Sequence, residues 1–162
     1  MSPFRGPIRR RNGEFAIVID DDEAALIRRL ADELRSLLTD ESSGSGADAL
    51  LVRLFPVAYP DDDELEDEYQ RLMREELVAS KLAALDVVDR AITERAPLDD
   101  AGMTAFMQSI NSVRLILGTM LDVSDDPEAE EVTLGLENSP EYALYGYLSW
   151  LLEHCVRALS GA

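Results

Sequence analysis

The side chains in this sequence that are most able to bind a cation or a basic partner are carboxylates, which are gathered in short stretches. Seven of the eight residues from Asp61 to Glu68 are acidic, and further acidic runs lie at Asp20–Glu23 and Asp122–Glu131. Clustered carboxylates attract hard cations, but an EF-hand site needs a central glycine and a defined register of oxygen ligands, which Asp122–Glu131 lacks. We therefore predict no metal site.

The run from Asp61 to Glu68 is better suited to a protein partner. Acidic patches steer positively charged partners and raise association rates. The alternative is a charge run that only solvates the end of a helix. The residues predicted to bind a protein with a basic surface are Asp61, Asp62, Asp63, Glu64, Glu66, Asp67 and Glu68.

Residues that usually carry catalysis do not converge in this sequence. His154 is the only histidine, which excludes a histidine-rich zinc site and a proton shuttle between two histidines. Neither a glycine-rich phosphate loop nor a GxSxG serine motif occurs. We therefore predict a non-catalytic protein without a cofactor, and a cryptic enzyme or metal-binding protein is the alternative.

Cys155 is the only cysteine, so the chain cannot form an internal disulfide. It lies on the apolar stripe of a predicted C-terminal helix, between Leu151 and Leu159, where a thiol is usually buried and unreactive. The alternative is a redox-sensitive thiol, which needs exposure and a lowered pKa. A single cysteine also fits the reducing cytoplasm, where we expect the protein.

A second pattern places polar residues and a glycine inside the most apolar segment. Asn111, Arg114 and Gly118 are three and four residues apart, so they share one helix face. Glycine in a helix costs about 1 kcal/mol relative to alanine, so Gly118 predicts the close approach of another backbone or side chain. A partly buried Arg114 needs a carboxylate or several carbonyls facing it, and a structural arginine is favoured over a ligand site.

Length and net charge narrow the class of protein. With 162 residues the chain suits one domain, and its formal charge is −18. Residues 13–162 hold 11 basic and 33 acidic side chains, a charge of −22, which repels nucleic acid and anionic membranes. A direct DNA-binding regulator is the weaker alternative, and it would use Arg5, Arg9, Arg10 and Arg11.

Hydrophobic periodicity predicts the elements that position these residues. We expect a mainly α fold, a bundle of about four to five helices with one or two short β-strands. Residues 1–12 are predicted to be a basic flexible arm, and residues 13–162 a single helical domain with a flexible loop near 40–47. Long amphipathic helices also make a homodimer conceivable. The predicted strands are 14–19 and 132–136, and the predicted helices are 21–38, 48–55, 65–92, 103–121 (the central one) and 140–159.

Three segments resemble, in the same order, an actinobacterial family long described only as a domain of unknown function. They are Arg53-Leu-Phe-Pro56 with Tyr59, the motif from Asn111 to Leu121, and the helix from Tyr142 to Leu159. The family includes the AosR-like oxidative-stress transcriptional regulators, and its genes commonly lie near that of the Clp-protease adaptor.

The resemblance implies a mostly helical cytoplasmic protein that acts on transcription by contacting a sigma factor or RNA polymerase under oxidative stress. A redox switch built on an internal cysteine pair, which the resemblance also suggests, cannot operate with Cys155 alone. The resemblance marks as structural residues of the family motif Arg53, Pro56, Asn111, Arg114 and Gly118.

Overall fold

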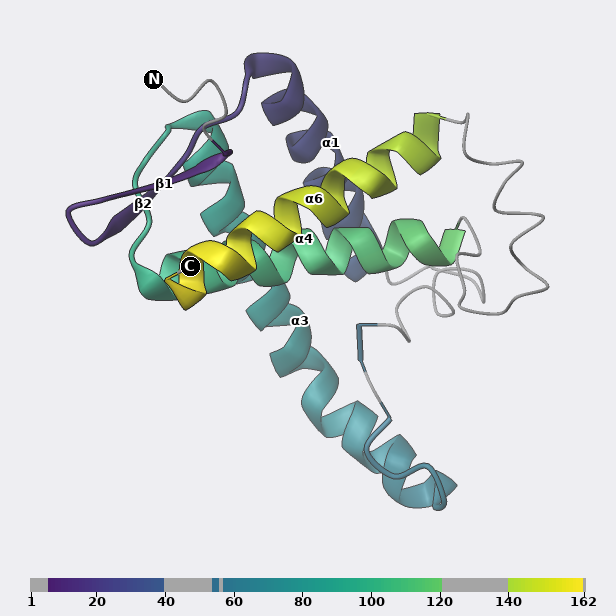
Figure 1. Ribbon diagram of the computed structural model, residues 1–162. Helices are drawn as coiled ribbons and strands as arrows, with labels where there is room; N and C mark the ends of the chain where they lie inside the picture. Colours follow the sequence, from purple (N-terminus) through teal and green to yellow (C-terminus); the bar gives the residue numbers. More distant parts are fainter. Residues whose placement is uncertain (1–5, 40–53, 56, 121–139, 162) are drawn as a thin grey trace.

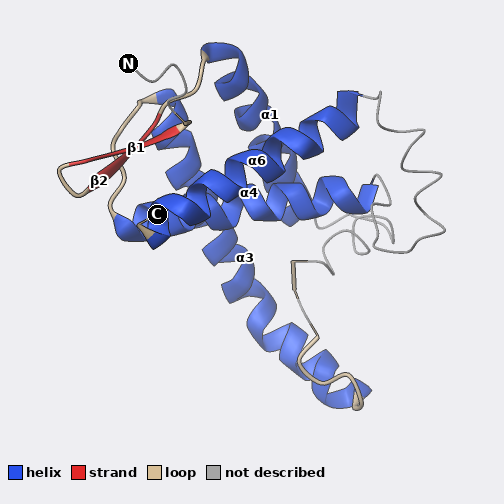
Figure 2. Cartoon of the chain, viewed as in Figure 1, coloured by secondary structure: helices blue, strands red, loops and turns tan. Residues whose placement is uncertain are grey.

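The computed structural model describes residues 6–39, 54–55, 57–120 and 140–161 (Figure 1). Within them, a two-stranded antiparallel hairpin is followed by four helices (Figure 2), so the predicted mainly α fold is confirmed. The loop predicted near 40–47, most of the helix predicted at 48–55 and the strand predicted at 132–136 lie outside these ranges. Leu54 and Phe55, the described end of that predicted helix, form a turn and a bend and are not helical. The elements are β1 (Ile8–Arg11), β2 (Glu14–Ile17), α1 (Asp21–Thr39), α3 (Asp63–Thr93), α4 (Asp100–Met120) and α6 (Pro140–Ser160).

Helix α4 is the central helix, as its apolar stripe predicted. It packs against α1, α3 and α6, and Met103, Phe106 and Ile110 are almost completely buried at spacings of three and four residues. The carboxylate of Asp99 accepts a hydrogen bond from the backbone N–H of Gly102 at 2.7 Å. Asp99 therefore caps the helix.

The N-terminal hairpin corrects the prediction of a flexible arm. Residues 8–11 form β1 and pair with β2, and the turn between them holds Asn12 and Gly13 at φ of 55° and 81°. Asn-Gly is the preferred pair for two-residue turns that need positive φ at both positions. Phe15 exchanges two backbone hydrogen bonds with Leu98, of 2.7 and 2.8 Å, so the hairpin is tied to the segment before α4. Strand β2 ends at Ile17, two residues earlier than predicted.

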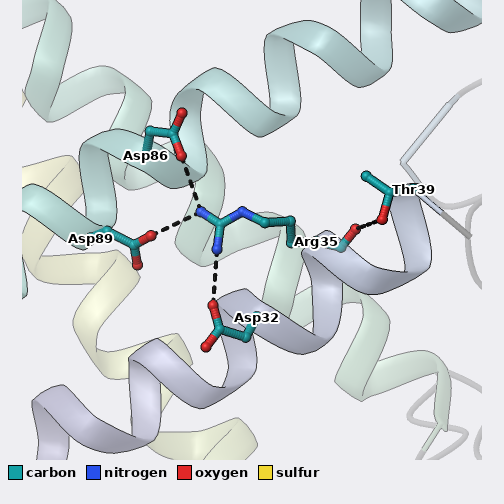
Figure 3. Close-up of polar contacts among 5 residues, drawn as sticks. All are labelled: Asp32, Arg35, Thr39, Asp86 and Asp89. Carbon is teal, nitrogen blue, oxygen red and sulfur yellow. Dashed lines mark hydrogen bonds and ion pairs between the residues drawn. The ribbon is translucent and has the colours of Figure 1, made fainter.

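Helices α1 and α3 are joined by an ion-pair cluster around Arg35 (Figure 3). The guanidinium of Arg35 lies 2.9 Å from Asp32 on its own helix, and 3.2 and 2.9 Å from Asp86 and Asp89 on α3. Burial lowers the pKa of Arg35, but the hydrogen bond and charge of Asp89 raise it, as do the charges of Asp86 and Asp32. These carboxylates outweigh burial, so the pKa of Arg35 lies above its ordinary value and Arg35 stays charged.

Helix α3 runs through two different environments. From Leu85 onward it buries apolar residues against α1 and α4. Between residues 63 and 76 no residue is buried, and this part, here called the projecting segment, extends away from the other helices (Figure 1). The acidic run from Asp61 to Glu68 therefore stands at the outer end of a protruding helix.

Candidate functional site

The acidic run predicted to bind a partner forms the tip of the projecting segment. The carboxylate of Asp62 caps α3 by accepting a hydrogen bond from the backbone N–H of Leu65 at 3.1 Å. Glu66 accepts hydrogen bonds from the backbone N–H of Ala58 at 2.9 and 3.2 Å. These two carboxylates hold the turn that leads into the helix.

The other five carboxylates of the run remain available to a partner. Each is exposed, and none has a hydrogen bond or ion pair with any residue that the structure describes. Their charge suits the positive end of the helix dipole, but that role needs only the first turn. The five are Asp61, Asp63, Glu64, Asp67 and Glu68.

An exposed apolar stripe runs beside these carboxylates. Leu65 and Leu72 are 45% and 66% exposed, and Tyr69 lies between them at helical spacing, with its ring 6.0 Å from that of Tyr59. Tyr59 is itself 44% exposed. Exposed apolar side chains that cluster within a polar rim mark interaction surfaces. The acidic run and this stripe together are here called the α3 tip surface.

The structure brings the residues of the family motif on α4 together around Tyr145 of α6. The guanidinium of Arg114 donates hydrogen bonds to the amide oxygen of Asn111 at 3.1 Å and to the hydroxyl of Tyr145 at 3.4 Å, and lies 5.7 Å from the centre of that ring. A Cβ at Gly118 would lie 2.9 Å from Cε2 of Tyr145. Tyr145 is thus the side chain that approaches Gly118.

The partners of Arg114 differ from the expected ones. No described carboxylate pairs with Arg114, and its Nε is buried without a hydrogen-bond partner among the described residues. The positive charge is instead met by an amide, a hydroxyl and an aromatic ring, which attract a cation more weakly than a carboxylate does. Arg114 therefore links α4 to α6 through its contacts with Tyr145.

Cys155 is completely buried in the core beside Leu148 and Leu151. Burial raises the pKa of its thiol to about 12, so almost no thiolate exists at neutral pH. A redox-sensitive thiol needs the opposite environment. In the folded protein Cys155 therefore lacks the exposure and the lowered pKa that the redox alternative needs.

The remaining predicted residues add no site. Arg53 and Pro56 lie outside the described residues. His154 is half-buried, with its ring 4.7 Å from that of Trp150. Within the described ranges, no three His, Cys, Asp or Glu side chains are placed to hold a metal ion, and no helix is both long and apolar enough to cross a membrane.

Sequence reasoning missed Lys81, the only lysine among fifteen basic residues. Lys81 is half-buried in a groove between α3 and α4 with a volume of about 350 Å³. The sequence does contain a signal, because Lys81 is the one basic residue that is not an arginine. Its meaning depends on the packing of α3 against α4, which the sequence alone does not show.

The described part of the chain defines a small, mainly α protein with a protruding acidic helix. The family model with the description "Domain of unknown function (DUF2017)" matches residues 1–159, so the chain belongs to this family.

Similar proteins include mycobacterial relatives that carry a functional name. AosR of Mycobacterium leprae is 29% identical over 94% of this chain and 86% of its own length. The oxidative stress regulators AosR of Mycobacterium tuberculosis and Mycobacterium bovis are each 27% identical over 96% of this chain and 87% of their own length. No solved structure matches the chain.

Proposed function

We propose that this protein is a non-catalytic regulator of the oxidative stress response in the cytoplasm, and that it acts by binding a basic surface of another protein through the α3 tip surface. The names of the mycobacterial relatives support the link to oxidative stress. The observation that carries the binding mode is the α3 tip surface, where five carboxylates without a partner among the described residues lie beside an exposed apolar stripe.

The two parts of this surface contribute differently to binding. The carboxylates attract a basic partner over roughly 10 Å at moderate salt and raise the association rate. The apolar stripe supplies short-range affinity, since burial of Leu65 or Leu72 contributes on the order of 1 kcal/mol each. A partner helix or loop with Lys or Arg around an apolar centre matches both parts.

The partner class that we propose is the transcription machinery, a sigma factor or RNA polymerase, as the family resemblance implies. Direct contact with DNA is the weaker mode because the whole chain carries −18. In addition, Arg9, Arg10 and Arg11 occupy successive positions of β1, where side chains alternate between the two faces of the hairpin. They therefore do not form one basic surface.

In this proposal, the protein does not sense oxidants through its own cysteine. Cys155 is buried, and its raised pKa keeps it protonated. We propose that oxidants act on the partner or upstream of it, and that this protein responds through the amount of complex formed.

Affinity purification with two matched variants tests this proposal. The tip variant combines Asp61→Asn, Glu64→Gln, Asp67→Asn and Glu68→Gln. The control variant removes four exposed carboxylates elsewhere by Glu14→Gln, Asp22→Asn, Glu94→Gln and Asp100→Asn, so both variants change the net charge equally. Wild type and control should retain the same partner at moderate salt from oxidised and unstressed cells, and the tip variant should lose it.

Two outcomes contradict the proposal. Retention of the partner by the tip variant would show that these carboxylates do not bind it. An equal loss with the tip and control variants would show that only net charge matters and that the α3 tip surface has no special role.

A further inference from the structure

We propose that the groove between α3 and α4 binds a small molecule with a carboxylate head and an apolar body, and that Lys81 is the cation that anchors the head. This inference does not rest on the proposed partner surface, because the groove lies beyond the projecting segment, where α3 meets α4.

The groove is lined by one cation, by uncharged polar side chains and by leucines. Its volume of about 350 Å³ falls in the range of small-molecule sites. The side chains of Leu34, Leu54 and Leu77 contribute to the walls from three different segments. Its polar lining comes from Lys81 and Ser80 on α3 and from α4 residues Gln108, Ser109, Asn111 and Ser112.

The ammonium group of Lys81 uses only one of its three hydrogen-bond donors within the described residues. Nζ of Lys81 lies 3.2 Å from Oγ of Ser112, and Ser112 in turn donates its own proton to the backbone oxygen of Gln108 at 3.0 Å. The Ser112 hydroxyl therefore accepts from Lys81, and two ammonium protons remain for a ligand.

Within the described part of the chain, the lack of a carboxylate paired with Lys81 is unusual in so acidic a protein. The chain has 33 acidic and 15 basic side chains, and Arg35 alone gathers three carboxylates, two of them on the same helix as Lys81. Among the described residues, no carboxylate forms an ion pair with Lys81. Burial accordingly lowers the pKa of Lys81, and no charge among the described residues opposes the shift.

A second polar group in the groove also lacks a partner. The hydroxyl of Ser109 is buried and has no hydrogen-bond partner among the described residues, and the whole residue is 4% exposed. A buried hydroxyl without a partner is destabilising by roughly 1–3 kcal/mol. A carboxylate pairs with the ammonium group, the hydroxyl can bond to a ligand oxygen, and the leucine side chains that line the groove suit an apolar body on the ligand.

Octanoate is a suitable probe because it joins a carboxylate to a short apolar chain, and octanol is its uncharged match. Isothermal titration calorimetry at neutral pH should detect millimolar or tighter binding of octanoate and at least about tenfold weaker binding of octanol. Lys81→Met should weaken octanoate binding by about tenfold or more, and Lys81→Arg should preserve it. The control Arg71→Met removes an exposed cation of α3 outside the groove and should bind octanoate like wild type.

Because Lys81 is the only lysine, its side chain can be observed directly. Protein labelled with 13C at lysine Cε should give one side-chain NMR signal, which reports the pKa of Lys81. Octanoate should raise that pKa, since a bound carboxylate stabilises the ammonium form.

Several results would overturn the inference. They are no binding of octanoate by the wild-type protein, equal binding by Lys81→Met, equal binding of octanol, or an unchanged pKa of Lys81 at saturating octanoate. One further result is a wild-type protein that binds no octanoate together with a folded Lys81→Met variant that is less stable than wild type. That result would show that Lys81 instead pairs with another group of the chain.

Discussion

At the scale of single residues, Cys155 gives the sharpest prediction because its burial is complete and its pKa is raised to about 12. Alkylation needs the thiolate and access to it, so it should occur only when the structure opens. We expect iodoacetamide to label the folded protein at least about 100-fold more slowly than the unfolded chain, as measured by mass spectrometry. Similar rates in the two states would contradict the buried position.

The raised pKa of Cys155 also predicts a dependence of stability on pH. Above about pH 9 the unfolded thiol loses its proton, whereas the folded thiol keeps it up to about pH 12. The folded state then binds more protons, so this contribution to stability is complete below pH 9 and falls as the pH rises. Urea unfolding near pH 8 and pH 10 should show a larger loss for wild type than for Cys155→Ala, and equal losses would refute the assignment.

Two glycines in helices offer a matched test of the contact between α4 and α6. Gly118→Ala would place a Cβ 2.9 Å from the ring of Tyr145, and we expect a net destabilisation of about 1–2 kcal/mol. A Cβ at Gly146 meets no described atom within 4 Å apart from chain neighbours and the backbone of its own helix, so Gly146→Ala should stabilise α6 by about 0.5–1 kcal/mol. Chemical denaturation measures both, and a stabilised Gly118→Ala variant would show that Tyr145 is not tightly held.

At the scale of elements, the Arg35 cluster is predicted to hold α1 against α3 (Figure 3). Arg35→Met should destabilise the protein by about 1–2 kcal/mol, because it leaves the partly buried Asp89 without its cation. Arg29→Met removes an exposed pair with Glu33 on α1 and should cost less than about 0.5 kcal/mol. Equal unfolding free energies for the two variants would contradict a structural role for the cluster.

The elements also show which parts of the fold a sequence reveals. The apolar spacing that predicted the central helix is a local pattern, and the burial of one face of α4 confirms it. The hairpin was missed although Asn12-Gly13 is a local turn signal, because the adjacent arginines suggested an unpaired arm.

The parts of the candidate site that were missed depend on contacts between distant segments. The sequence predicted that Arg114 is partly buried and that something approaches Gly118, but not that one tyrosine of α6 serves both. Lys81 likewise gains its importance only where α3 packs on α4. Helical periodicity tells which face of a helix is buried, and it does not tell which residue of another helix lies opposite.

At the scale of the whole molecule, the negative charge is unevenly used. Asp32, Asp86 and Asp89 neutralise Arg35 and stabilise the fold, whereas five carboxylates at the α3 tip have no partner among the described residues. The projecting segment buries no residue, so it contributes little to the core. We expect the four-residue tip variant described above to unfold within about 0.5 kcal/mol of wild type in urea. A much larger loss would show that these carboxylates serve the fold.

The most direct test of the central claim is photo-crosslinking in cells with a benzophenone amino acid at Leu72 or at Val156. Both side chains are exposed, at 66% and 51%, but only Leu72 lies on the α3 tip surface, while Val156 is on α6. We predict a crosslink to one protein with a basic surface from Leu72, none from Val156, and loss of the Leu72 crosslink in the tip variant. A crosslink to the same partner from Val156 alone, or one from Leu72 that persists in the tip variant, would contradict the account.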